Sequence, residues 1–153
     1  MKLDRARVLF AAQYAAPYKG NFLPSLAMLE QRIKDRYGAV CAYLFPRKAE
    51  QQPWWDAFRL SHKVYLSGDD TKLISKDEAD AIIRDFSPSL VHTHFEGYDK
   101  PMAAAIKRCP DFVRMVWHMH DMLSYQRNMV KAFYQRACFF RHYGVPFLNI
   151  GGG

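Results

Sequence analysis

The sequence has no long hydrophobic run, few cysteines and none of the common glycine motifs. No apolar stretch approaches the ~20 residues of a membrane-spanning helix, and the N-terminal segment predicts a first strand rather than a signal peptide. The three cysteines are odd in number and far apart, which favours a reducing compartment and argues against a disulfide framework or a zinc site. The G-x-G-x-x-G, Walker and G-x-S-x-G motifs are absent, so the sequence does not support a dinucleotide fingerprint, a P-loop or a nucleophile elbow.

The composition is that of a single folded domain with a basic surface. Half of the 153 residues are apolar and 15% are aromatic, which is enough for a sizeable core. The net charge of +7 favours anionic partners such as nucleic acid, an acidic membrane surface or a phosphate-bearing substrate. The stretch 127–142 carries four basic residues and no acid, so it is either a solvated helix face or an anion-binding patch.

Apolar runs of strand length alternate with helical stripes along the chain. This alternation predicts an α/β fold, a doubly wound and mostly parallel Rossmann-like sheet in one domain of residues 1–150, followed by a glycine tail or truncated end at 151–153. The expected strands are 7–12, 40–45, 64–66, 90–93, 112–117 and 145–150. The expected helices are 22–37, 101–109 and 125–143, together with a helix that Ser75 and Glu78 cap and that ends at Phe86.

The segment 46–63 is long for a connection inside a compact domain. Such a segment is usually functional or contains a short helix. Its Trp54–Trp55 pair is compatible with a sugar platform, a membrane anchor or simple packing of the segment over the sheet.

Histidines follow two of the expected strands. His92 and His94 alternate at the end of one, and His118 and His120 end the other, with Asp121 beside them. Because parallel strands present their carboxyl ends at one edge of a sheet, these side chains predict a site there. Hydrogen-bonded and substrate-binding histidines are the favoured interpretation and no metal is expected, because no Cys or Asp/Glu cluster reinforces the four histidines. A metal-dependent hydrolase that uses His92, His94, His118 and His120 is the alternative.

Three segments carry a resemblance to a known family: RVLFAAQYAAPYKGNFLPSLAMLEQRI at the start, DFSPSLVHTHFEGY in the middle and VRMVWHMHD after it. Together they resemble the N-terminal domain of GT-B glycosyltransferases, and more narrowly the retaining, nucleotide-sugar-dependent family that builds capsules, lipopolysaccharide and other surface glycans. Two positions depart from the family pattern. The first loop has Gly20 followed by Asn21 instead of paired glycines, and Ser89 replaces the aspartate that precedes the first histidine strand.

The resemblance implies an acceptor-side half of a transferase that is inactive alone. It implies a nucleotide-sugar donor, a glycan or lipid-linked acceptor, no cofactor, and a C-terminal donor-binding domain that is missing or acts in trans. His120 and Asp121 match the family's cleft positions and are the expected catalytic residues. The expected substrate-binding residues are Gly20, Asn21, His94 and Glu96.

The basic stretch adds an expectation about membranes. Its aromatic neighbours fit a membrane interface better than a base-reading surface, so Arg127, Lys131 and Arg141 predict an anionic membrane patch and no nucleic-acid partner. The expected location is cytoplasmic, with peripheral attachment to the inner face of the membrane as an extension. A basic membrane-surface binding module without catalysis is the non-enzymatic alternative.

Overall fold

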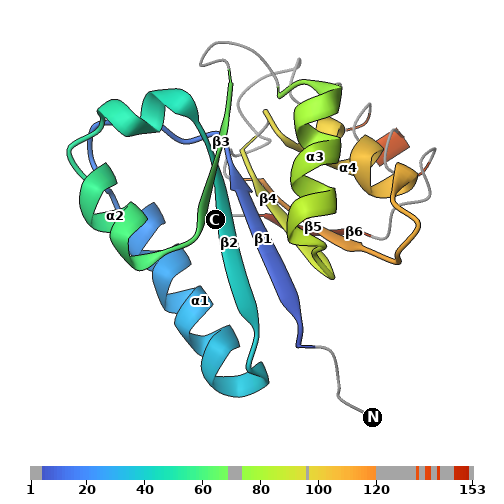
Figure 1. The fold of residues 1–153 in the computed structure, drawn as a ribbon, viewed down its shortest axis with the longest axis horizontal. Coiled ribbons are helices and arrows are strands. Elements are labelled where there is room, and N and C mark those ends of the chain that lie inside the picture. The colour runs from blue at the N-terminus through green and yellow to red at the C-terminus, as the bar shows by residue number, and fades with distance from the viewer. Residues whose placement is uncertain are drawn as a thin grey trace.

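The computed structural model describes residues 5–68, 74–95, 97–119 and 147–151, together with four helical residues, Tyr134, Ala137, Cys138 and Arg141. Six strands form one sheet in the order β3-β2-β1-β4-β5-β6, and every neighbouring pair is parallel (Figure 1). The strands are β1 Arg7–Ala12, β2 Val40–Pro46, β3 Val64–Ser67, β4 Leu90–His94, β5 Arg114–Met119 and β6 Phe147–Gly151. This confirms the doubly wound α/β sheet that the sequence predicts.

Helices cover both faces of the sheet. The helical elements are α1 Phe22–Tyr37, the 3-10 helix η1 Arg47–Gln51, α2 Trp55–Ser61, α3 Lys76–Phe86 and α4 Asp99–Arg108. Figure 1 shows α1 and α2 on one side of the strands, with α3 and α4 on the other. Because side chains alternate along a strand, Leu9 and Ala11 of β1 join the α3–α4 core, whereas Phe10 and Ala12 join the α1–α2 core. The order of the chain reverses between β1 and β4, the place where open α/β sheets bind ligands.

Local sequence signals explain where the helices begin and end. Helix α1 has the predicted bounds, and Gly38 follows it in the left-handed conformation at φ 60°. Ser75 caps α3 by accepting the Glu78 N–H, while Glu78 accepts the Ser75 N–H in return, which confirms the predicted capping box. Helix α4 begins at Asp99, two residues before the predicted start, so Pro101 still lies in its first turn.

Several strand boundaries differ from the sequence prediction by one to two residues, whereas the long connection contains short helices, as the sequence allows. Strand β5 begins at Arg114 rather than at residue 112, because its ladder with β4 starts at the Leu90–Arg114 pair and Phe112 remains 71% exposed. Strand β4 extends to His94, and β6 begins at Phe147, after Pro146. The connection 46–63 holds η1 and α2, and Trp54 and Trp55 are buried there, which supports the packing interpretation of that pair.

The predicted helix at 125–143 lies outside the described residues, apart from four that have helical conformation: Tyr134, Ala137, Cys138 and Arg141. No helix in the described ranges is both long and apolar enough to cross a membrane.

Candidate functional site

The carboxyl ends of β1, β4 and β5 lie next to one another in the middle of the sheet. In the strand register Ala12 pairs with His94, and His94 pairs with His118. His92, two residues earlier on β4, faces the same side of the sheet as His94 and pairs with Phe10 of β1. The strand order and register therefore bring three histidines from two strands together on the face that α1 also covers.

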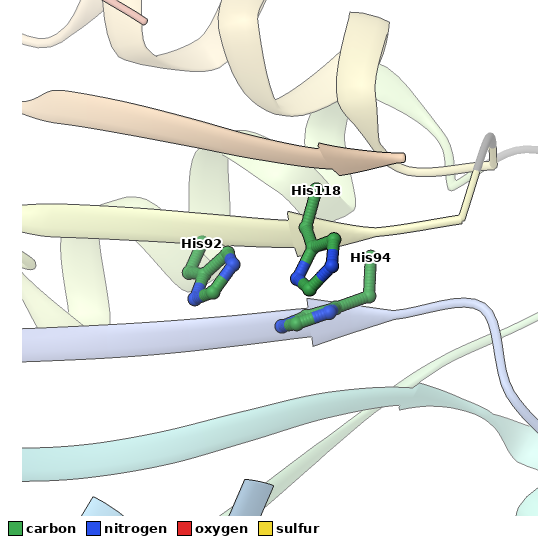
Figure 2. Close-up of side chains that lie close together, drawn as sticks. All are labelled: His92, His94 and His118. Carbon is green, nitrogen blue, oxygen red and sulfur yellow. The ribbon is translucent and has the colours of Figure 1, made fainter. Parts of the chain in front are cut away.

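The three imidazole rings form a compact group (Figure 2). The ring centroids of His92 and His94 are 4.1 Å apart, those of His94 and His118 are 5.1 Å apart, and those of His92 and His118 are 5.7 Å apart. One nitrogen from each ring lies within 4.8 Å of the others. We call these three residues the histidine cluster.

Aromatic rings surround the cluster on the side of α1. The Phe10 ring centroid lies 5.7 Å from that of His92, and the Phe22 ring meets His94 edge-on at 5.2 Å. His92 and His94 are buried and His118 is half-buried. Burial lowers the pKa of His118 below its usual value, because the charged imidazolium is poorly solvated there. At neutral pH His118 is therefore a neutral imidazole with a lone pair on one nitrogen.

The loop of residues 13–21 joins β1 to α1 at the same edge. Gly20 has φ +53°, a left-handed conformation that a side chain would strain, and Asn21 is the N-terminal cap residue of α1, without a side-chain cap bond. The Tyr14 hydroxyl donates to the Tyr18 carbonyl at 2.6 Å. The Trp54 indole donates to the Ala16 carbonyl at 2.8 Å, so the long connection holds the loop in place.

The residue after β4, Phe95, packs against this loop and against the start of α1. The Phe95 ring stacks on Tyr14 at 5.8 Å and meets Phe22 edge-on at 5.0 Å. Its backbone has φ 64°, an uncommon conformation for a bulky side chain. The end of β4 is thus held by aromatic packing in a strained turn.

A small apolar cavity lies beside the loop, between α1 and α2. Its volume is about 200 Å³. Lys19 and His62 are its basic members, and the other lining residues are Leu23, Pro24, Ala27, Trp54, Ala57 and Phe58. A cavity of this kind accommodates a small apolar or aromatic group beside the Lys19 ammonium.

The structure locates three of the predicted site residues at this edge: Gly20, Asn21 and His94. The Phe22–His94 ring contact shows that the start of α1 reaches the end of β4. Glu96, His120, Asp121, Arg127 and Lys131 lie outside the described residues, and Arg141 is exposed. The sequence pattern did not single out Tyr14 or Phe95 as members of the site, since an aromatic residue in a loop has no spacing that distinguishes a binding role from packing.

Comparison with known proteins finds similarity in structure only. No family model matches the sequence, and no curated protein matches it. MurG of Acinetobacter baumannii superposes with a TM-score of 0.60 at 14% identity, over 97% of this chain and 42% of MurG. Leucoanthocyanidin reductase of Vitis vinifera, solved with NADPH, gives 0.64 at 15% identity, over 95% of this chain and 49% of the reductase. AtPrR2 in its apo form gives 0.61 at 13% identity, over 97% and 48%.

These similarities establish the Rossmann-like fold and do not decide between its uses. MurG is a GT-B glycosyltransferase, whereas the solved complex of leucoanthocyanidin reductase contains NADPH. The chain spans less than half the length of each of these three solved proteins. The similarity therefore shows the fold alone, and the choice between functions depends on the site itself.

Proposed function

We propose that this chain is the acceptor-side half of a GT-B, retaining glycosyltransferase of the surface-polysaccharide type. It acts with a second, donor-binding domain, in the same protein or in trans, to transfer sugar from a nucleotide-sugar to a glycan or lipid-linked acceptor. The reaction uses the carboxyl edge of β1, β4 and β5 as one wall of the cleft and needs no cofactor.

The loop of residues 13–21 is the observation that favours this function over a reductase. A dinucleotide-binding sheet has a tight glycine turn after its first strand, so that the pyrophosphate reaches the start of the next helix. Here β1 ends at Ala12 and α1 begins at Phe22, and the loop between them has one glycine and contains Tyr14 and Tyr18. The loop is anchored by the Trp54 hydrogen bond to Ala16. The loop therefore lacks the tight glycine turn that is typical of a dinucleotide phosphate site.

The proposed roles follow from position and from the chemistry of sugar transfer. Retaining transfer must stabilise a departing diphosphate and a developing oxocarbenium ion. Gly20 and Asn21 approach the donor phosphate with backbone groups at the start of α1, a position that favours negative charge. His94 and Glu96 bind substrate, and His120 with Asp121 acts in the cleft.

The proposal includes a membrane-facing surface. Arg127, Lys131 and Arg141 attract anionic headgroups, each contributing about 1 kcal/mol near the surface. In this proposal the protein lies peripherally at the inner face of the membrane, next to a lipid-linked acceptor. Binding to anionic vesicles should weaken with salt, and the Arg127→Glu, Lys131→Glu variant should reduce it without unfolding the domain.

Ligand titration tests the proposal. The purified protein is titrated with nucleotide-sugars and with NADPH, binding is followed by NMR, and product formation is followed by mass spectrometry. We expect weak binding of a nucleotide-sugar, weaker or no binding of NADPH, and no sugar transfer by this chain alone, because half of a cleft does not exclude water or complete the donor contacts.

A pair of glycine variants provides the matched control. Gly20 and Gly38 both have left-handed backbone, at φ +53° and +60°, but Gly38 follows α1 at its opposite end. Both Gly20→Ala and Gly38→Ala should lower stability, and only Gly20→Ala should weaken nucleotide-sugar binding. Tight NADPH binding that Gly20→Ala abolishes would instead assign the chain to the reductase-like class.

A further inference from the structure

We infer that the histidine cluster is a binding site for a divalent transition-metal ion, with zinc the best match. The inference concerns metal binding by His92, His94 and His118 and does not depend on the proposed sugar transfer. It gives His94 the role of a metal ligand in place of direct contact with substrate. It rests on the residue types, on their separation, on the rigidity of their positions and on the shell around them.

The donor set selects the class of metal. Neutral imidazole is a preferred ligand of Zn²⁺, Cu²⁺ and Ni²⁺, whereas Mg²⁺ and Ca²⁺ require oxygen ligands. In the part of the chain that the structure describes, the group consists of histidines alone, without a carboxylate or thiolate. Three protein ligands with one open position is the arrangement of catalytic zinc sites, in which water or a substrate atom completes the tetrahedron.

The separations are close to those that an ion requires. Zinc lies about 2.0–2.1 Å from each imidazole nitrogen, so two ligands of a tetrahedral site are roughly 3.4 Å apart. In the cluster the three nitrogens lie within 4.8 Å of one another. Metal binding requires the imidazole rings to rotate about their side-chain bonds to close this difference.

The backbone holds the three ligands in fixed positions. His92 and His94 are separated by one residue on β4, and His118 is the register partner of His94 on β5. Both strands lie in the interior of the sheet, with hydrogen-bonded neighbours on each side. Ligands on such strands lose little freedom when the metal binds, which distinguishes this group from histidines that meet on a loop.

The environment is also that of a metal site. Phe10 packs beside His92, and the edge of Phe22 contacts His94, which places an apolar wall behind polar ligands. An apolar shell limits the access of water and strengthens the electrostatic interaction of the ion with its ligands. His118 is more exposed than the other two and marks the side from which an ion enters.

Metal titration tests the inference directly. The protein, freed of any affinity tag and treated with a chelator, is titrated with Zn²⁺ against a chromophoric competitor, with Co²⁺ as a spectroscopic probe and with Mg²⁺ as a negative control. We expect one equivalent of Zn²⁺, visible Co²⁺ bands typical of tetrahedral nitrogen ligation, a rise in Tm with Zn²⁺, and no response to Mg²⁺. The absence of a stoichiometric Zn²⁺ site in the wild-type protein would overturn the inference.

Variants assign the ligands. His118→Ala removes the most accessible ligand and should weaken Zn²⁺ binding by more than the about 10–100-fold that loss of an outer partner costs. The matched control is His62→Gln, which removes a histidine outside the cluster, one whose Nδ1 lies 2.7 Å from Oε2 of Glu30. The control should bind Zn²⁺ as the wild type does. Equal weakening in both variants, or in neither, would contradict the assignment.

A measurement on the wild type covers the case in which a buried variant fails to fold. Addition of Zn²⁺ should shift the imidazole NMR signals of His92, His94 and His118, and should leave those of His62 in place. Zinc-induced shifts confined to other histidines would overturn the site.

Discussion

The Tyr43 hydroxyl donates a 2.6 Å hydrogen bond to Oε2 of Glu30, a carboxylate that α1 buries against β2. The same carboxylate pairs with His62 Nδ1 at 2.7 Å and with the Lys34 ammonium. Burial, followed by the hydrogen bond to Glu30, raises the pKa of Tyr43, so the phenol is a protonated donor at neutral pH. A charged group in an apolar layer thus joins α1, β2 and the end of α2.

Removal of the Tyr43 hydroxyl should therefore destabilise the domain. Hydrogen bonds to charged groups contribute about 1.5–3 kcal/mol, so Tyr43→Phe should lower the free energy of unfolding by this amount, as measured by urea denaturation. Tyr65→Phe is the control, because Tyr65 donates to the exposed carboxylate of Asp85 and should lose less. Equal losses of unfolding free energy in the two variants would show that the burial of Glu30 does not strengthen its hydrogen bond with Tyr43.

The capping box of α3 gives a second prediction. Ser75→Ala should lower the free energy of unfolding by about 1 kcal/mol, the usual effect of losing a side-chain N-cap. Ser61→Ala should be nearly neutral, because Ser61 is an exposed residue at the C-terminal end of α2. Thermal unfolding of both variants at neutral pH is the measurement. A neutral Ser75→Ala would mean that the Glu78 half of the box suffices alone.

The same box predicts a pH dependence. The hydrogen bonds from Ser75 hold the pKa of Glu78 below its ordinary value. Because the folded pKa is depressed, the unfolded chain takes up the proton first as the pH falls. The contribution of Glu78 to the free energy of unfolding is therefore complete above its pKa in the unfolded chain, about 4.3. It is lost as the pH falls through the lower pKa of Glu78 in the folded protein. In Glu78→Gln this part of the acid destabilisation should disappear, which unfolding at pH 3–7 would show.

The fold was predictable from the sequence because its signals are local, whereas the site depends on contacts between distant residues. Leu9 and Val91 lie in apolar runs that predict buried strands, and Ser75 is typical of the residue that caps the start of a helix. Phe112 misled the prediction of β5, since its side chain is apolar but exposed. The alternation of His92 and His94 predicted a shared face, but the approach of His118 depends on the β4–β5 register, which no local pattern encodes. Likewise, the sequence around Glu30 is that of an exposed helix position, and only the fold brings Tyr43 and His62 next to its carboxylate.

Cysteine reactivity provides a further prediction. Burial, and then the nearby charge of Glu30, raise the pKa of the Cys41 thiol to about 11. Cys41 is buried in the α1–α2 core, whereas Cys138 is exposed. At pH 8 a maleimide or iodoacetamide reagent should label Cys138 rapidly and Cys41 only after denaturation, because the thiolate is the nucleophile. Peptide mass spectrometry after timed labelling distinguishes the two. Comparable labelling rates in the native protein would indicate that α1 opens readily from the sheet.

Phe95 permits a test of the strained end of β4. An L-residue in the left-handed region costs about 1–2 kcal/mol, and glycine avoids this cost. Phe95→Ala loses the ring contacts with Tyr14 and Phe22 and keeps the strained backbone, whereas Phe95→Gly loses the same contacts and relieves the strain. The glycine variant should therefore be the more stable of the two by about 1 kcal/mol in urea unfolding. The control is Val40, a partly exposed residue at the start of β2. There the alanine variant should be more stable than the glycine variant by about 0.5–1 kcal/mol, the usual difference. If alanine is also the more stable substitution at position 95, the turn after the histidine strand is unstrained, and the aromatic contacts alone determine its shape.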